Sequence, residues 1–167
     1  MKFLPIAVSL LVWAGLMVGI VGFAANDTVT ATVTAQSITI DAVDGVVAYG
    51  TIAVSGSQNT VTLGDTQSVV NLGNVNTDVS IQGQDSGTWE LDLAVIGADQ
   101  YTHEISTDGG TAWAFFDEDA YYDFVTALEE YGTESETQTF DLRISTPSSS
   151  TVYTSQSVDV SVQSAAS

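Results

Sequence analysis

Apolar and polar residues alternate along most of the chain after its first 24 residues. Apolar side chains at every second position are typical of half-buried β-strands. The runs that show this alternation are Val29–Ala35, Ile38–Ile40, Val47–Val54, Val61–Leu63, Val69–Leu72, Val79–Ile81, Trp89–Val95, Tyr101–Ile105, Trp113–Phe115, Phe140–Ile144 and Val158–Val162. Short strands separated by Gly, Ser, Asp and Asn turns predict an all-β fold, specifically an immunoglobulin-like antiparallel β-sandwich.

One segment departs from the alternation. Between Asp117 and Tyr131 the apolar residues are spaced as on one face of a helix, at positions 121, 124, 125 and 128. Asp117 is a suitable N-cap and Gly132 a suitable C-terminal residue. This pattern predicts a short helix or helical loop across one end of the sandwich.

The N-terminus has the pattern of an export signal. Lys2 is followed by an uncharged apolar run from Phe3 to Phe23, and Gly22 and Ala24 are the small residues that precede a cleavage site. We therefore expect a signal peptide over residues 1–24 and one β-sandwich domain over residues 25–167. A run of this length could also span a membrane, so an uncleaved anchor is the alternative. Either way, the domain is predicted to be extracellular or on the cell surface.

The charge of residues 25–167 restricts the possible partners. This part of the chain holds all 21 acidic residues and a single basic side chain, Arg143, which gives a net charge of −20. Such a surface repels phosphates, which excludes nucleic acids and anionic membranes as partners. Divalent cations or a salty medium would screen it, and self-association is possible under those conditions. The chain contains no cysteine, so its core must hold the domain together without disulfides.

The residues needed for catalysis are scarce, so we predict that the protein is not an enzyme. His103 is the chain's sole histidine, and its alternation with Tyr101 and Ile105 predicts a packed or hydrogen-bonded side chain. No serine lies in a nucleophile elbow, and no histidine or cysteine cluster suits zinc. Dinucleotide and P-loop motifs are also absent from the sequence. We expect no organic cofactor.

Calcium is the one cofactor that the sequence suggests. Four carboxylates are crowded into the predicted helical segment, and Ca²⁺ prefers hard oxygen ligands. These candidate ligands are Asp117, Glu118, Asp119 and Asp123. Their spacing does not follow an EF-hand loop, and a solvated acidic face is the alternative interpretation.

Trp89 is the most informative aromatic residue. It follows a turn rich in Ser and Gly and begins a strand, where it could be a core residue or an exposed ligand contact. The stretch Ser86–Leu91 resembles the WxL domains of bacterial cell-surface proteins, in which a similar turn leads into Trp-x-Leu. This chain has one such motif, because the C-terminal strand reads Ser157–Ser161 without tryptophan. The resemblance implies non-covalent attachment to peptidoglycan, with Trp89 and Leu91 as wall- or ligand-binding residues.

A second resemblance covers most of the domain. The stretches Asn74–Leu91 and Gly132–Val162 are similar to short secreted β-domain proteins of candidate-phyla bacteria. That likeness implies no specific function. We expect a non-catalytic secreted or cell-surface domain that binds a cell-wall polymer or a surface protein. The alternatives are a structural subunit of a surface layer or filament, and a released carbohydrate-binding or adhesin module.

Overall fold

The computed structural model describes residues 30–93 and 96–167, so the expected signal peptide lies outside the described residues. The chain divides after Thr34. Residues 30–34 carry no helix or strand and are exposed, whereas Ala35–Ser167 form the folded unit described next. Among the described residues, no helix has the length and apolar character needed to cross a membrane.

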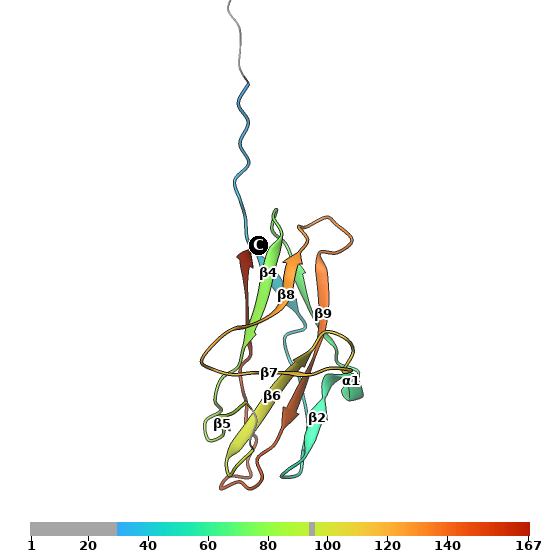
Figure 1. Cartoon of the computed structure of the whole chain (residues 1–167). Coiled ribbons are helices and arrows are strands. Elements are labelled where there is room, and N and C mark those ends of the chain that lie inside the picture. Colours follow the sequence, from blue (N-terminus) through green and yellow to red (C-terminus); the bar gives the residue numbers. More distant parts are fainter. Residues whose placement is uncertain (1–29, 94–95) are drawn as a thin grey trace, which may run out of the picture. The chain divides into compact units, whose positions relative to one another are not determined.

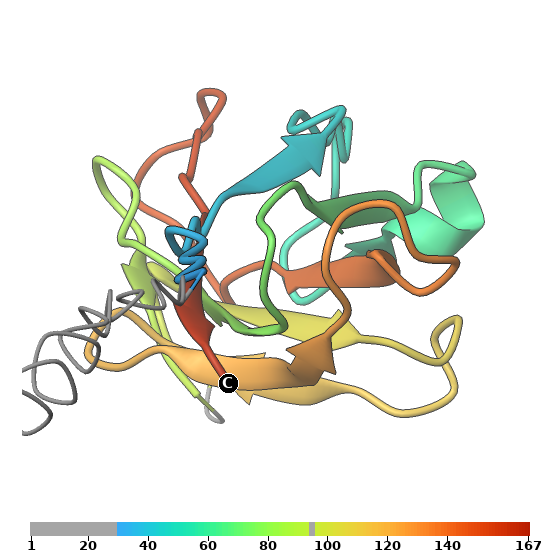
Figure 2. The same cartoon turned by 90° about the horizontal axis from the view of Figure 1, so that it is seen from above.

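The larger sheet is formed by seven strands (Figure 1). Its members are β1 (Ile40–Val43), β2 (Ser57–Asn59), β3 (Gln67–Asn71), β5 (Glu90–Leu91), β6 (Gln100–Ser106), β7 (Ala114–Phe116) and β9 (Thr137–Ser145). The main path runs β1-β3-β9-β6-β5, while β2 pairs with β9 and β7 pairs with β6. The pairings are antiparallel except for β5 with β6. Seen from above in Figure 2, this sheet is strongly curled.

The smaller sheet has three antiparallel strands in the order β10-β4-β8. They are β4 (Thr77–Gln82), β8 (Tyr122–Leu128) and β10 (Ser161–Ala166). Both sheets contribute to one apolar core, made of Val69, Val79, Ile81, Ile105, Phe116, Leu128, Phe140 and Leu142. A second buried cluster joins Leu91, Tyr101 and Ile144. The prediction of a mostly β fold is therefore confirmed.

Strand β9 lies in the middle of the main path of the larger sheet and is paired along both edges. One edge meets β3 over Thr137–Phe140 and then β2 over Arg143–Ser145, while the other meets β6 over Asp141–Ser145. Its two neighbours on the first edge are connected by α1 (Thr60–Leu63). The Asn59 side chain caps α1 by accepting from the Thr62 amide, and Gly64 ends it at φ 69°.

A buried carboxylate fixes α1 against β9. Asp141 is 3% exposed, and its Oδ1 accepts hydrogen bonds of 2.8 Å from the hydroxyls of both Thr60 and Thr66. The Thr60 Oγ1 in turn accepts from the Leu142 amide at 3.0 Å. A hydroxyl that donates and accepts here satisfies two buried polar groups that would otherwise be unpaired.

The helix predicted between Asp117 and Tyr131 is wrong, because the middle of this segment, Tyr122–Leu128, is strand β8. The free edge of β4 offers a backbone partner, and β8 pairs with it across a register shift near Val79. Asp117 caps this segment as predicted, but it caps a turn and not a helix. Asp117 Oδ1 accepts from the amides of Asp119 and Ala120, and the chain then enters the strand. A bulged edge strand spaces its apolar residues irregularly, which imitates helical spacing.

Other strand predictions also need correction. Val61–Leu63 lies in α1, and Val47–Val54 contains no strand although it has alternating apolar residues. Within the described part of the predicted strand Trp89–Val95, only Glu90–Leu91 forms a strand, β5. Strand β10 begins at Ser161, later than the predicted start at Val158. In each case alternation marks an extended or amphipathic segment, while backbone pairing decides whether it becomes a strand.

The contact between Thr60 and Asp141 is testable. Replacing Thr60 by Val keeps the side-chain shape but leaves the Leu142 amide and one Asp141 oxygen without that partner. We expect Thr60→Val to lower the free energy of unfolding by about 1–3 kcal/mol, measured by urea denaturation. The matched control is Thr62→Val on the exposed face of α1, which should change stability by less than about 0.5 kcal/mol. Equal effects of the two variants would contradict this role for Asp141.

Candidate functional site

A groove of about 610 Å³ lies between the segment 47–54 and the loop 150–156. Trp89 and Ile144 also line it. The complete lining is Val47, Ala48, Tyr49, Gly50, Thr51, Ile52, Val54, Trp89, Ile144, Thr146, Pro147, Ser150, Val152, Tyr153, Thr154, Ser155 and Gln156. None of these residues is charged, although the chain carries 21 acidic residues. The groove therefore combines aromatic rings, small aliphatic groups, hydroxyls and one amide.

The turn before Trp89 holds this residue at the groove. Ser86 Oγ accepts hydrogen bonds from the amides of Thr88 and Trp89, and the Ser86 amide donates to the Trp89 carbonyl at 2.9 Å. The Trp89 indole donates to Ser150 Oγ at 3.0 Å, which ties the ring to the loop 150–156. The ring centroid lies 6.4 Å from that of Tyr101. Trp89 is thus half-buried, with its edge hydrogen-bonded and part of its surface open to the groove.

The two residues predicted from the WxL resemblance occupy different positions. Leu91 is 6% exposed and belongs to the buried cluster with Tyr101 and Ile144, and it is not among the residues that line the groove. Its amide donates to Asp85 Oδ1 at 2.6 Å. Trp89 packs against the same cluster but also lines the groove. Of the pair, Trp89 is the residue that a ligand could touch.

Asp99 holds the loop that forms one wall of the groove, and the sequence pattern gave no sign of it. Its carboxylate accepts from the amide and the hydroxyl of Thr151, both at 2.8 Å, and lies 2.9 Å from Ser150 Oγ. The hydrogen bond from the Thr151 amide, followed by those from the two hydroxyls, lowers the pKa of Asp99 below its ordinary value. The carboxylate is therefore ionised at neutral pH and keeps its bonds to this wall.

The phenol of Tyr49 connects the groove to the buried histidine. Tyr49 lines the groove, and its hydroxyl oxygen lies 2.9 Å from His103 Nε2. His103 is 1% exposed and packs between Tyr101 and Phe116, which confirms the prediction of a packed, hydrogen-bonded histidine. Burial lowers the pKa of His103 to about 4 and raises the pKa of Tyr49 above its ordinary value. Both groups are neutral at physiological pH, so they add no charge beneath the groove.

The four predicted calcium ligands lie outside this groove. Asp117 caps its turn as described above, Glu118 and Asp119 are exposed in that turn, and Asp123 is exposed on β8. The neighbouring Asp85 raises the pKa of Glu118 by charge repulsion, which indicates crowding of negative charge there. Within residues 30–93 and 96–167, no group of three or more His, Cys, Asp or Glu side chains is arranged to hold a metal ion. The calcium site stays a prediction.

The titration of His103 tests the burial of the residues under the groove. Because the chain has one histidine, its ring protons give one unambiguous set of NMR signals. We expect a midpoint near pH 4, against about 6.5 for an unfolded histidine.

The same shift has a consequence for stability. The unfolded chain binds this proton more readily than the folded chain, so the free energy of unfolding should fall as the pH drops from 6.5 towards 4. His103 alone should account for a loss of about 2 kcal/mol between pH 7 and pH 5. An NMR midpoint near 6.5 in the folded protein would show that water reaches the ring and would contradict this packing.

Comparisons of this chain with protein-family models, with curated proteins and with solved structures find no match.

Proposed function

We propose that this protein is an exported, non-catalytic bacterial cell-surface domain with an immunoglobulin-like sandwich fold, which binds a cell-wall polysaccharide non-covalently. The observation that carries the proposal is the uncharged, aromatic-lined groove on a chain with 21 carboxylates. A site for a cation or a basic partner on such a chain would be expected to contain some of these carboxylates. Their exclusion from the groove favours a neutral ligand.

The groove provides the two kinds of contact that a neutral sugar chain requires. Sugar rings present apolar C–H faces, which stack on aromatic side chains, and hydroxyls, which bond polar groups. Trp89 and Tyr153 supply rings, and Tyr153 is 82% exposed. The hydroxyls of Thr154 and Ser155 and the amide of Gln156 lie along the same loop. An apolar surface with a few placed polar groups is the usual composition of a small-molecule site.

The resemblance to WxL domains supports the same ligand class. It implies peptidoglycan attachment through the Trp-x-Leu region, and Trp89 of that motif lines the groove. A released carbohydrate-binding or adhesin module would use the same surface and differ only in where the protein resides. The absence of convergent charged groups in the groove lining favours binding over catalysis, since glycoside hydrolysis usually needs a pair of carboxyl groups.

Co-sedimentation with purified cell walls of the producing organism tests the proposal. We expect the wild-type protein to sediment with walls from which covalently attached protein has been removed. Tyr153→Ala should weaken this binding by about tenfold or more, since loss of a stacking ring is worth about 1–3 kcal/mol. Tyr153 is too exposed for its loss to affect the fold, and unchanged thermal melting would show this directly.

The matched control is Tyr131→Ala. Tyr131 is 64% exposed and is not among the groove residues, so its removal should leave wall binding unchanged. Repeating the assay with Ca²⁺ and with a chelator tests the predicted calcium ligands separately. Failure of the folded wild-type protein to sediment under both conditions would reject wall binding, and equal losses in the two tyrosine variants would reject the groove as its site.

A further inference from the structure

Two neighbouring strands of the fold have a free edge. In the described part of the chain, β8 pairs with β4 alone and β7 pairs with β6 alone. Free edges expose unpaired backbone N–H and C=O groups, which natural proteins usually protect with lysine, proline or a covering segment. Neither β7 nor β8 contains lysine, arginine or proline; β7 has three residues, and β8 carries one charged residue, Asp123, and a register shift against β4. These edges are therefore suited to pair with a further strand.

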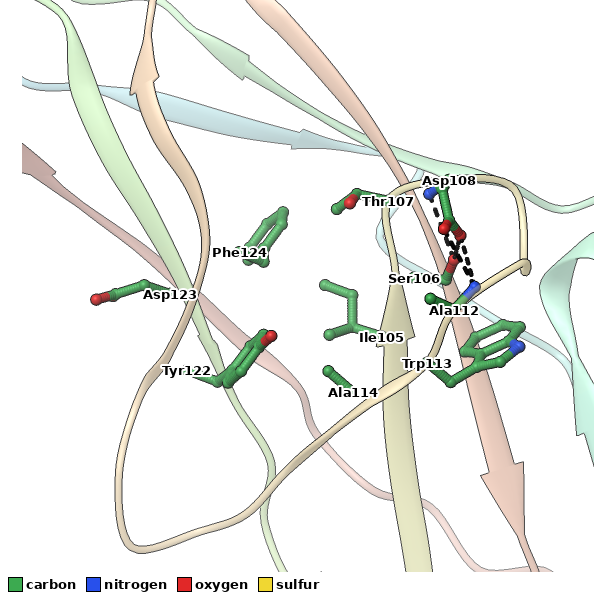
Figure 3. Close-up of a pocket in the computed structure, with 10 residues that line it drawn as sticks. All are labelled: Ile105, Ser106, Thr107, Asp108, Ala112, Trp113, Ala114, Tyr122, Asp123 and Phe124. Carbon is green, nitrogen blue, oxygen red and sulfur yellow. Dashed lines mark hydrogen bonds between the residues drawn. The ribbon is translucent and has the colours of Figure 1, made fainter.

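A cleft of about 210 Å³ lies between these two strands (Figure 3). Tyr122 and Phe124 point from β8 towards Ile105 and Ala114, so the cleft reaches the side of the apolar core. Tyr122 remains 39% exposed. A strand added at this edge would place alternate side chains over an apolar surface.

Two carboxylates stand in the cleft lining, Asp108 and Asp123. Asp108 is engaged by its own loop, where its Oδ1 accepts from the Ala112 amide, the Ser106 hydroxyl and the Thr111 amide, and these bonds lower its pKa. Asp123 is exposed on β8. A strand that carried further negative charge would be repelled here, whereas a neutral strand would not.

The chain contains one segment with the required properties. Residues 30–35 alternate threonine with Ala31, Val33 and Ala35, which is the pattern of a strand with one apolar face. Residues 30–34 carry no strand, and Val33 is 96% exposed. No charged residue occurs between Asp27 and Asp41. The apolar side chains are small, which suits a narrow cleft, and the segment is nearly as long as the seven-residue β8.

We propose that residues 30–35 of one copy add as a strand to the free β8 edge of a second copy. Val33 and its neighbouring alanines would enter the cleft beside Phe124, and the threonines would face solvent. Main-chain hydrogen bonds supply affinity and the alternate side chains supply register, as in other cases of strand addition. Because the two contacting surfaces differ, the copies join head to tail, into an open filament or, where the rotation between copies closes, into a ring.

This assembly goes beyond the proposed wall binding and uses none of the groove residues. It gives the structural-subunit alternative a specific geometry. The donated segment is uncharged, whereas the accepting edge carries Asp123, so repulsion between copies comes from that carboxylate and from the rest of the acidic surface. We therefore expect assembly to strengthen with salt, because the Debye length falls to about 3 Å at 1 M ionic strength.

Sedimentation velocity of the exported protein at low and at molar salt tests the proposal. Wild-type protein should form large assemblies in molar salt, and Val33→Asp should remain monomeric. The matched control is Thr34→Asp, which adds the same charge on the other face of the segment and should keep assembling. Because Val33 is almost fully exposed, both variants should retain the wild-type melting temperature. A monomeric wild-type protein in molar salt, or full assembly of Val33→Asp, would overturn the proposal.

Disulfide trapping locates the contact, since the natural chain has no cysteine. Val33→Cys protein is mixed with Tyr122→Cys protein and oxidised, and intact mass identifies the mixed dimer. We expect at least tenfold more mixed dimer than with Tyr131→Cys, which places an exposed cysteine away from the cleft. Equal yields with the two partners would show that residues 30–35 do not bind the β8 edge. Wall binding is measured separately through Tyr153, so failure of one proposal leaves the other intact.

Discussion

The two hydrogen-bonded edges of β9 hold the larger sheet together. Without disulfides, the register of this strand against β3, β2 and β6 must be fixed by backbone pairing and by buried polar contacts. Asp141 secures one edge through two threonine hydroxyls. On the same strand, Arg143 forms a two-point ion pair with Glu104, which is 3% exposed, and its guanidinium lies 4.7 Å from the Trp113 ring. Arg143, the single Lys or Arg side chain of residues 25–167, therefore neutralises the buried carboxylate of Glu104.

The two proposed binding surfaces differ from the rest of the molecule in their lack of charge. The remaining carboxylates give the molecule a strong negative charge, which repels copies from one another. Against that background, an uncharged surface is informative. The groove around Trp89 and the segment 30–35 are both free of charged residues, and each offers apolar groups that the fold leaves accessible. Their chemistry differs, because the groove is aromatic with a hydroxyl-rich loop, whereas the segment presents small side chains and a backbone that carries no strand pairing over residues 30–34.

The sequence predicted the fold well where strands have partners on both sides. In β6 and β9 the alternation of Tyr101–Ile105 and Phe140–Ile144 marked the core correctly, and His103 was placed among buried neighbours. Prediction failed at edges. The segment from Asp117 to Tyr131 imitated a helix because β8 pairs along one side and across a register shift. Periodicity reports which side chains are buried, and it cannot report which backbone lies alongside.

The candidate site was predictable only in part. Trp89 was identified from its position after a Ser/Gly turn, and the structure adds that its ring lines a groove. The position of the loop 150–156 was not predictable, because Asp99 reaches Ser150 and Thr151 across about fifty residues of sequence. Tyr153 likewise becomes significant only when the loop that carries it is seen beside Trp89. Such convergence depends on loop conformation, for which the sequence has no periodic signal.

The most direct test of the account is an NMR titration of the tryptophan indole N–H signals with soluble peptidoglycan fragments. Residues 25–167 contain two tryptophans, Trp89 in the groove and Trp113 beside Arg143, so one reports on the site and the other serves as an internal reference. The account predicts that the Trp89 signal shifts in a saturable manner while the Trp113 signal stays in place. An unchanged Trp89 signal, or equal shifts of both, would contradict the assignment of the groove as the glycan site.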